Sequence, residues 1–345
     1  IRAVIHGDDF TMLGWEKDLD WFRTEIVKRF EVKMRGRMGK DAHDDKAMRI
    51  LNRIVTYQDG RVEYEPDQRH AELIIKMMGL ADSTKSVITP GEKWNGKFEE
   101  GEEESLDKEG ATMYRALSAR ANYLSQDRSD IRQAVKEISR RMANPRKRDM
   151  HMLKRLARYL VGRPRMISIF EKQANQKELV GWSDSDWAGC PETRKSTSGG
   201  VIQWGTHTLK TWSTTQNIIS MSSAEAEYYA LVKTGSQCLG MSAIGRDMGV
   251  KSAVKLKTDA TAAQGIGQRK GLGQLRHLET NQLWIQDRIH KGDIVLEKVP
   301  GKENIADSLT KYADGESTAV HREGCKLEYK QERHILAPAC VEVEM

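Results

Sequence analysis

The stretch Leu179-Val180-Gly181-Trp182-Ser183-Asp184 decides how this chain is interpreted, because an alternating apolar run ends there on an acidic residue. The alternation predicts a half-buried strand with Asp184 at its end. Strand patterns also occur at residues 166–170, 200–204 and 209–213. Three or four short antiparallel strands, followed by helix, strand, helix, helix, strand and helix, predict an α/β fold in which helices pack on a mixed sheet.

A second acidic residue, Glu227, lies near the start of a predicted helix. Ser222 and Glu225 have the spacing of a capping box, in which side chains bond to the first backbone N–H groups of a helix. Glu227 lies two residues further on, about 200° round the helix from Glu225. We therefore expect Glu225 to hold the helix end and Glu227 to face elsewhere.

Two more acidic residues follow predicted strands. Asp259 comes directly after the strand pattern at residues 254–258, and Asp307 lies in a short predicted helix after the pattern at residues 293–299. Carboxylates gathered in one place repel each other and retain their protons unless a cation compensates them. Mg²⁺ prefers oxygen ligands, and two such ions about 3.5 to 4 Å apart can activate water and stabilise the leaving oxygen of a phosphodiester. We therefore predict one hydrolytic metal site with four acidic ligands: Asp184, Glu227, Asp259 and Asp307.

The order and the neighbours of these four residues resemble the Asp, Glu, Asp, Asp series of ribonuclease H. The matching motifs are Ser183-Asp184, Glu227-Tyr228-Tyr229-Ala230, Thr258-Asp259 and Asn304-Ile305-Ala306-Asp307. The flanking stretches at residues 184–190, 196–200 and 222–228 are similar to the ribonuclease H domain of Ty1/copia-type retrotransposon Pol polyproteins. The resemblance implies that the four acids are catalytic and hold Mg²⁺, with Mn²⁺ as a second candidate ion.

The resemblance extends upstream and covers roughly residues 1–315. His6-Gly7-Asp8-Asp9-Phe10 is similar to the reverse-transcriptase palm motif Tyr-x-Asp-Asp, which implies that Asp8 and Asp9 are metal ligands of a polymerase remnant. Residues 114–117, 128–131 and 153–160 resemble the segment that joins polymerase to nuclease in this family. His6 replaces the tyrosine of the motif, and neither the fingers nor the upstream aspartate precedes it. We therefore expect no polymerase activity from this chain alone.

The histidines differ from those of cellular ribonucleases H. Those enzymes carry a flexible histidine before the last aspartate, and residues 299–304 contain none. His277 matches a histidine typical of the copia-type domain, and the resemblance suggests that it assists product release. A surface or helix-packing role is the alternative for His277.

The distribution of charge predicts contact with nucleic acid. Lysine plus arginine exceeds aspartate plus glutamate by only 56 to 50, a net charge of +6. Between Arg140 and Arg165, however, ten basic residues accompany one acid, Asp149. Such a run suits a surface that follows phosphates, because each neutralised phosphate releases counterions. The candidate contacts are Arg146, Lys147, Arg148, Lys154, Arg155 and Arg158, with Arg269, Lys270, Arg276 and His277 in a second patch.

Several of these assignments have alternatives. The basic run also fits a solvated helix face opposite an apolar stripe formed by Leu153, Leu156 and Leu160. Asp186 shares the predicted strand face of Asp184, and we expect it to have a supporting or surface role. Most of the tryptophans are expected to pack in the core or on the sheet, and Trp187 is the strongest candidate for stacking on a base.

Cysteine spacing indicates the cellular compartment, and hydropathy indicates whether a membrane helix is present. The cysteines Cys190, Cys238, Cys325 and Cys340 show no paired spacing, and no secretory segment precedes them, so we expect an intracellular protein of the cytoplasm or nucleus. No apolar run approaches the roughly 20 residues that a membrane helix needs. The last two cysteines and their neighbouring histidines lack the spacing of a compact zinc knuckle.

Composition divides the chain into five predicted parts. They are a partial palm with its following segment (1–90), a glycine- and glutamate-rich linker (91–110), a basic helical connection (111–165), a ribonuclease H domain (166–315) and a tail without predicted regular structure (316–345). Within the connection, Ser129 is expected to cap a helix that ends at Asn144-Pro145.

The leading hypothesis is an endonuclease that cleaves the RNA strand of an RNA–DNA hybrid by recognising groove shape and 2′-hydroxyls. The expected partners are the hybrid and the rest of the Pol polyprotein, including integrase and the reverse-transcriptase fingers, and no membrane. Two alternatives stay open. One is a decayed fragment that binds nucleic acid without catalysis. The other is an integrase-type strand transferase, which would need a terminal glutamate on a late helix. Because the chain starts at Ile1, we expect it to be a truncated sequence.

Overall fold

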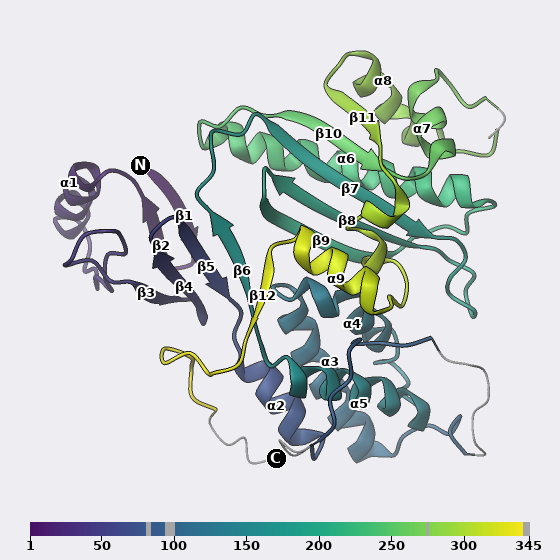
Figure 1. Cartoon of the computed structure of the whole chain (residues 1–345), viewed down its shortest axis with the longest axis horizontal. Helices are drawn as coiled ribbons and strands as arrows, with labels where there is room; N and C mark the ends of the chain where they lie inside the picture. Colours follow the sequence, from purple (N-terminus) through teal and green to yellow (C-terminus); the bar gives the residue numbers. More distant parts are fainter. Residues whose placement is uncertain (81–83, 94–100, 274–275, 341–345) are drawn as a thin grey trace.

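The computed structural model describes residues 1–80, 84–93, 101–273 and 276–340. Their strands form two five-stranded sheets and one two-stranded hairpin, and a group of helices lies below the sheets in Figure 1. Residues 94–100 of the predicted linker and 341–345 of the predicted tail lie outside this description.

The first sheet carries the acidic residues and has the strand order β11-β10-β7-β8-β9. Strands β7, β8 and β9 are antiparallel to their neighbours in this group, whereas β10 runs parallel to β7 and β11 runs parallel to β10. The bounds are β7 Glu178–Asp186, β8 Thr197–Trp204, β9 His207–Thr215, β10 Ala253–Thr258 and β11 Ile294–Lys298. This arrangement confirms the mixed sheet of the expected ribonuclease H-like fold.

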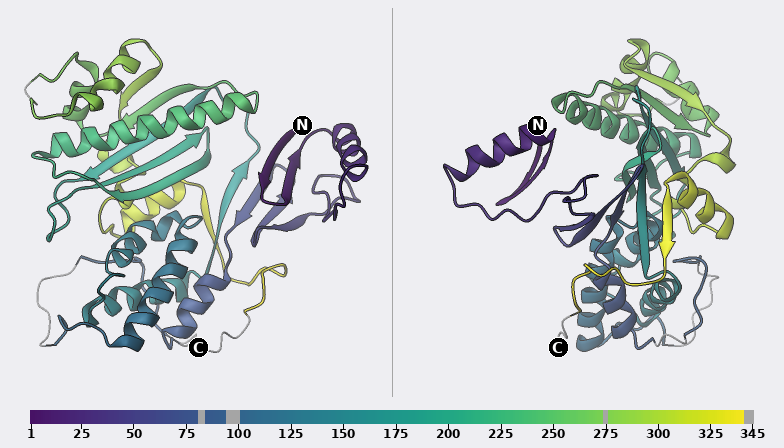
Figure 2. Two further views of the ribbon diagram at one scale, coloured as in Figure 1. Left: turned by 180° about the vertical axis from the view of Figure 1, so that it is seen from behind. Right: turned by 60° about the vertical axis from the view of Figure 1, so that its left-hand side comes forward.

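Helices cover one face of this sheet, and the C-terminal turns pack on the other together with the helix that follows them and with strands of the second sheet. The long helix α6 crosses the sheet in Figure 2, and its Tyr228 and Leu231 are fully buried with Ile202 of β8 and Leu256 of β10. On the opposite face, Val201 packs in a core cluster with residues of the C-terminal turns. The bounds are α6 Ser223–Asp247, α7 Thr261–Gln268, η2 Thr280–Leu283, α8 Trp284–His290, η3 Gly301–Glu303 and η4 Asp307–Leu309.

The second sheet is antiparallel throughout and has the order β12-β6-β5-β4-β3. Its bounds are β3 Ala47–Ile50, β4 Arg53–Gln58, β5 Arg61–Glu65, β6 Arg165–Glu171 and β12 Leu327–Lys330. The sequence predicts that the strand at residues 166–170 belongs with the strands that carry the acids. This strand, β6, instead lies in the second sheet. Alternation marks a strand without selecting its partner, and here Arg165 of β6 pairs with Glu65 of β5 at 2.8 Å.

The C-terminal stretch contains regular structure that its composition does not reveal. Helix α9 (Gly315–Gly324) and strand β12 follow the last acidic residue of the predicted site. Strand β12 has only four residues, and its register is set by pairing with β6, some 160 positions earlier in the chain. The domain boundary predicted near residue 166 stays a prediction.

A helical part occupies the middle of the chain, as the sequence predicts. Leu153, Leu156 and Leu160 of α5 have no exposed surface and pack with Leu117 of α3, so the apolar stripe of α5 faces a core. The bounds are α2 Arg69–Met77, α3 Lys108–Ser125, η1 Ser129–Ile131, α4 Arg132–Ser139 and α5 Lys147–Gly162.

The first residues form a hairpin and a helix that project from the rest of the chain (Figure 2). Strands β1 (Arg2–His6) and β2 (Asp9–Leu13) meet at a turn in which Gly7 has a φ of 57°, and α1 spans Glu16–Val27. None of the residues of α1 is buried.

A buried polar network lies between the helical part and the C-terminal stretch. Arg128 is fully buried and donates two hydrogen bonds to Asp130, at 2.9 and 2.7 Å. Tyr159 also donates to Asp130, at 2.9 Å. The carboxylate therefore neutralises a guanidinium that is removed from water.

The expected cap at Ser129 is wrong. Ser129 lies in the turn η1, and its hydroxyl bonds to His321 of α9 at 2.9 Å, while α4 begins without a side-chain cap. The Ser129 hydroxyl, which the local pattern assigned to the start of the helix, is bonded instead to the buried side chain of His321. Ser129 thus connects α9 to the helical part.

All four cysteines lie within the described residues, and they form no disulfide. In the described ranges, no helix combines the length and the apolar character needed to cross a membrane.

Asp130→Asn is expected to lower the free energy of unfolding by about 3 kcal/mol, because it leaves the buried guanidinium of Arg128 without a compensating charge. Urea unfolding followed by circular dichroism measures this loss. The control is Asp287→Asn on the exposed side of α8, for which we expect a change of at most about 0.5 kcal/mol. Equal losses in the two variants would contradict the role of the network.

Candidate functional site

Three of the four predicted acids come together at one edge of the first sheet. Carboxylate oxygens of Asp184, Glu227 and Asp259 all lie within 4.8 Å of one another. Asp184 lies on β7, and Asp259 directly follows the parallel neighbour β10, so both leave the sheet at the same edge. Glu227 reaches the same point from α6.

Gly181 explains how α6 comes close enough to β7. A Cβ atom at this position would lie 2.5 Å from the Sγ atom of Cys238 and 2.8 Å from a methyl carbon of Thr234, both on α6. A side chain at residue 181 would therefore push the helix away from the strand. The glycine of the alternating stretch thus sets the distance between Asp184 and Glu227.

Burial and mutual repulsion disturb the protonation of two of the acids. Burial raises the pKa of Asp184 well above its usual range, a hydrogen bond from the Thr310 hydroxyl opposes this effect, and repulsion by Asp307 and Asp259 adds to it. Burial also raises the pKa of Glu227, and repulsion by Asp184 and Asp259 raises it further. The site is therefore short of positive charge.

The donor set fits a hard divalent cation. Glu227 accepts a hydrogen bond from the Ser185 backbone at 3.2 Å through Oε1, while its buried Oε2 has no hydrogen-bond partner among the described residues. An unpaired buried carboxylate oxygen is costly, and a cation relieves that cost. Three carboxylates and no nitrogen or sulfur ligand match the preference of Mg²⁺ and Mn²⁺ for oxygen.

The fourth acid, Asp307, lies beside this group and not within it. Its Oδ1 atom is 2.6 Å from the Nζ atom of Lys311, one helical turn later in the chain. Asp307 is nevertheless near enough to raise the pKa of Asp184. The structure therefore places a carboxylate and an ammonium together at the rim of the three-acid site.

Three further residues, Lys311, Asn304 and Thr310, support the acids and were not predicted from the sequence. Asn304 donates to the Ser183 carbonyl at 3.0 Å and to Asp259 at 3.4 Å, and Thr310 donates to Asp184. The spacing of four residues between Asp307 and Lys311 was a visible signal. The contacts of Asn304 and Thr310 cross more than 40 residues and leave no local pattern.

His277 lies against the start of α6. Its Nε2 atom is 2.9 Å from Oε2 of Glu225, and the same oxygen accepts the Met221 N–H at 2.8 Å. Ser222 accepts the Glu225 N–H, which is one half of the predicted capping box, while the Glu225 carboxylate bonds to the Met221 N–H instead of the Ser222 N–H. His277 thus packs against α6, as its helix-packing alternative predicts, and its partner Glu225 is two residues before Glu227.

The predicted phosphate contacts of α5 mostly have partners within the chain. Arg146 and Arg148 pair with Glu103, Lys147 lies 2.6 Å from Glu104, and Arg155 lies 2.5 Å from Glu92. The remaining predicted residues are Arg158, which donates to the Lys85 carbonyl, Arg269, which donates to the Leu272 carbonyl, and Lys154, Lys270 and Arg276. The surface that the sequence predicts for phosphates is thus partly neutralised.

The other candidates lie away from the three acids or support the sheet. Asp8 and Asp9 lie at the β1–β2 turn of the projecting hairpin (Figure 1), where Asp9 is 3.5 Å from Arg35. Asp186 accepts the Thr197 backbone N–H and so holds the start of β8. Trp187 is 53% exposed and donates to the Ser220 carbonyl at 3.0 Å, which leaves much of its ring accessible.

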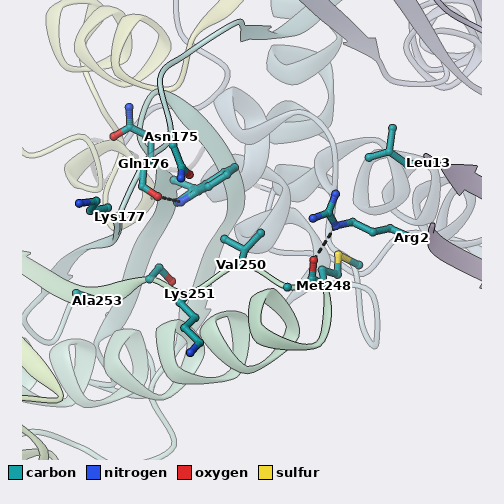
Figure 3. A pocket seen from close by; sticks show the side chains of 12 residues that line it. Arg2, Leu13, Asn175, Gln176, Lys177, Met248, Val250, Lys251 and Ala253 are labelled. Atoms are coloured by element: carbon teal, nitrogen blue, oxygen red, sulfur yellow. Dashed lines mark hydrogen bonds between the residues drawn. The ribbon is translucent and has the colours of Figure 1, made fainter. Parts of the chain in front are cut away.

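An open groove of about 920 Å³ lies at the other end of the sheet (Figure 3). It is lined by the segments 175–177 and 248–253, which precede β7 and β10, and by Arg2 of the hairpin. Arg2 donates to the Met248 carbonyl at 2.6 Å. Since the acids lie where β7 and β10 end, the groove is not part of their site.

Comparison with known proteins identifies Pol polyproteins as relatives. The chain is 29% identical over 203 residues to the retrovirus-related Pol polyprotein from transposon RE1 of Arabidopsis thaliana, a match covering 58% of this chain and 14% of that protein. It is 24% identical over 319 residues to the corresponding protein from transposon TNT 1-94 of Nicotiana tabacum, covering 90% of this chain and 23% of that protein. The chain thus spans less than a quarter of either relative. No protein-family model matches it.

Among solved structures, the chain is similar to LC11-RNase H1, which was isolated from compost by a metagenomic approach. The identity is 20%, the match covers 39% of this chain and 93% of that chain, and the TM-score is 0.29. A structure of LC11-RNase H1 in complex with an RNA/DNA hybrid gives 19% identity over 39% and 94% of the two chains, with a TM-score of 0.28. The fold assignment rests on the strand order and pairing described above.

Without divalent ions, the stability of the chain is expected to fall as the pH rises from about 5 to about 9. The folded pKa values of Asp184 and Glu227 are raised above their unfolded values, so the folded state binds more protons. The resulting stabilisation is complete below about pH 4 and is lost as the pH rises through the folded values. The midpoint of thermal unfolding in EDTA measures this trend. Asp184→Asn should flatten the curve, and parallel curves would refute the assignment.

Lys311→Gln is expected to strengthen binding of Mn²⁺ two- to threefold, roughly the effect of losing one half-exposed ion pair. The ammonium competes with a cation for the charge of Asp307, and the amide does not. Isothermal titration calorimetry at constant pH measures the affinity. Lys291→Gln, on the exposed turn after α8, changes the net charge equally and should leave the affinity as in wild type. Weaker or unchanged binding in Lys311→Gln would argue against this competition.

Proposed function

Because this chain belongs to the copia-type Pol polyproteins of retrotransposons and has a ribonuclease H-like fold in its C-terminal part, we propose that residues 166–315 hydrolyse the RNA strand of RNA–DNA hybrids. The observation that carries this proposal is the group of three carboxylates at the edge of the mixed sheet, one of which has a buried oxygen without a partner.

The acids of the site have distinct tasks in this proposal. Asp184 and Asp259 are fixed at neighbouring strand ends, and Glu227 approaches from the helix, so three oxygens converge on one point. Two bound divalent ions would supply charge neutralisation and an activated water for attack on the phosphodiester. Thr310 and Asn304 orient Asp184 and Asp259 through hydrogen bonds.

Asp307 and Lys311 form the variable part of the site. Their ion pair is half-exposed at the rim, so it can open without disturbing the core. Once the pair opens, Asp307 can join the other acids, and Lys311 can approach the negative charge of the substrate. This is how the fourth predicted acid contributes although it lies outside the group of three.

The proposed preference for a hybrid rests on the shape of the duplex and not on contacts with particular bases. RNA-containing duplexes present a wide minor groove lined with 2′-hydroxyls, which a sequence-independent nuclease recognises by shape. We also propose that Trp187, which is exposed and directly follows β7, stacks on the substrate. We further propose that Asp8 and Asp9 belong to an incomplete polymerase site, that the chain acts with the rest of Pol, and that it does so inside the cell.

Asp184→Asn is expected to reduce Mg²⁺-dependent cleavage of hybrid RNA by more than about 100-fold, because a ligand charge worth several kcal/mol is lost. Gel analysis of an end-labelled RNA strand annealed to DNA measures the rate. Asp186→Asn is the matched control, since asparagine can still accept the Thr197 N–H, and it should retain most of the activity.

Cleavage that persists in Asp184→Asn would end this proposal. Salt-dependent binding of the hybrid by the wild-type chain, without cleavage in Mg²⁺ or Mn²⁺, would instead favour the non-catalytic alternative. Joining of DNA strands would favour the integrase-type alternative, against which stands the fourth acid, an aspartate in a short turn.

A further inference from the structure

We propose that the start of α5 is a binding surface for the phosphate backbone of the hybrid, and that the acidic residues 102–104 occupy this surface in the free protein. We call Glu102, Glu103 and Glu104 the acidic clamp. The nature of the partner rests on the proposed function, whereas the clamp rests only on contacts within the chain.

Glu103 and Glu104 pair with cations of α5 or of the residue before it, and Glu102 contacts a histidine of α5. The pairs are Glu102 with His151 at 3.0 Å, Glu103 with Arg146 and Arg148, and Glu104 with Lys147 at 2.6 Å. All of these contacts join residues more than 40 positions apart. The composition of residues 91–110 predicts a linker, but its described C-terminal part is seated on the basic helix.

Backbone hydrogen bonds hold the acidic clamp in place independently of charge. The Lys147 N–H donates to the Glu104 carbonyl at 3.0 Å, and the Leu106 N–H donates to the Pro145 carbonyl at 3.0 Å. Leu106 also packs against the helical core. The side chains of the clamp can therefore exchange partners while its backbone stays attached.

The basic surface reaches the nuclease through the loop between β7 and β8. Glu192 of this loop lies 2.6 Å from Arg141 and 3.4 Å from Arg148. The same loop follows the strand that carries Asp184. A duplex whose backbone lies on the start of α5 is thus next to the strand of the candidate active site.

Two pairs of the acidic clamp, Glu104 with Lys147 and Glu103 with Arg146, are exposed enough to be replaced, whereas the side chains of Arg148 and Glu102 are only 14% and 16% exposed. The side chains of Lys147 and Glu104 are 54% and 64% exposed, and those of Arg146 and Glu103 are 38% and 49% exposed. Exposed ion pairs contribute little to stability and are screened by salt. A nucleic-acid backbone presents a denser row of charges and gains entropy by releasing counterions. The phosphates of the hybrid therefore replace the clamp carboxylates as partners of the basic side chains.

The test measures binding of a fluorescent hybrid of about 20 base pairs by anisotropy in the Asp184→Asn background, where cleavage does not interfere. The clamp variant carries Glu102→Gln, Glu103→Gln and Glu104→Gln. The matched control carries three equally neutralising changes on exposed residues elsewhere: Glu316→Gln, Glu323→Gln and Glu332→Gln. At about 0.1 M salt, the clamp variant should bind roughly tenfold more tightly than the control. Its plot of log K against log salt concentration should steepen by about 0.9 for each cation freed.

Equal affinities in the clamp variant and the control would overturn the proposal, as would tighter binding without a steeper salt dependence. Adding Arg146→Gln and Lys147→Gln to the clamp variant should cancel most of the gain. If circular dichroism shows that the triple variant is unfolded, Glu104→Gln alone replaces it, with an expected two- to threefold gain. A wild-type chain that never cleaves, combined with the predicted gain, would defeat the nuclease proposal and leave the clamp standing.

Discussion

The crowding of negative charge at the edge of the first sheet is the constraint on which the rest of the molecule depends. Three carboxylates meet within 4.8 Å, and burial makes their repulsion more costly. The fold imposes this proximity by rigid means, with two acids at adjacent parallel strand ends and the third on a helix that Gly181 admits close to β7. The partial compensation comes from one short stretch, residues 304–311, which supplies an amide, a hydroxyl and an ammonium. Ile305, Ala306 and Leu309 of the same stretch pack against the second face of the sheet. One short segment therefore contributes both to the core and to the charge balance of the site.

Residues from distant parts of the chain also connect the first sheet to the rest of the molecule. Strand β6 precedes the strands of the first sheet in sequence but pairs with β5 and β12 in the second sheet. Helix α9 follows the last acid and bonds through His321 to Ser129 of the helical part. The C-terminal stretch therefore leaves the first sheet and packs against parts of the chain that come earlier in the sequence. The first sheet and the helical part are therefore connected by segments from both ends of the sequence that surrounds the candidate site.

Local patterns were sufficient for the features that are themselves local. The alternation of residues 179–184 and the capping box at Ser222 identified β7 and the start of α6, and with them the positions of Asp184 and Glu227. Features that depend on distant partners were not predictable in this way. The pairing of β6, the bond of Ser129 to His321 and the contacts of residues 102–104 all join segments that sequence spacing does not relate. Lys311 is an intermediate case, since its spacing from Asp307 is informative only once the acid is known to lie at a site.

The short strand β12 has a consequence for how the protein matures. Because β12 completes the second sheet only by pairing with β6, and α9 covers the turn that contains Asp307, the surroundings of the acids are unfinished until residues 315–330 are available. Synthesis proceeds from the N-terminus, and those residues leave the ribosome after every acid of the site has already emerged. A nascent chain therefore carries the turn with Asp307 before the helix that packs on it, and a premature stop after Asp307 leaves that turn without α9.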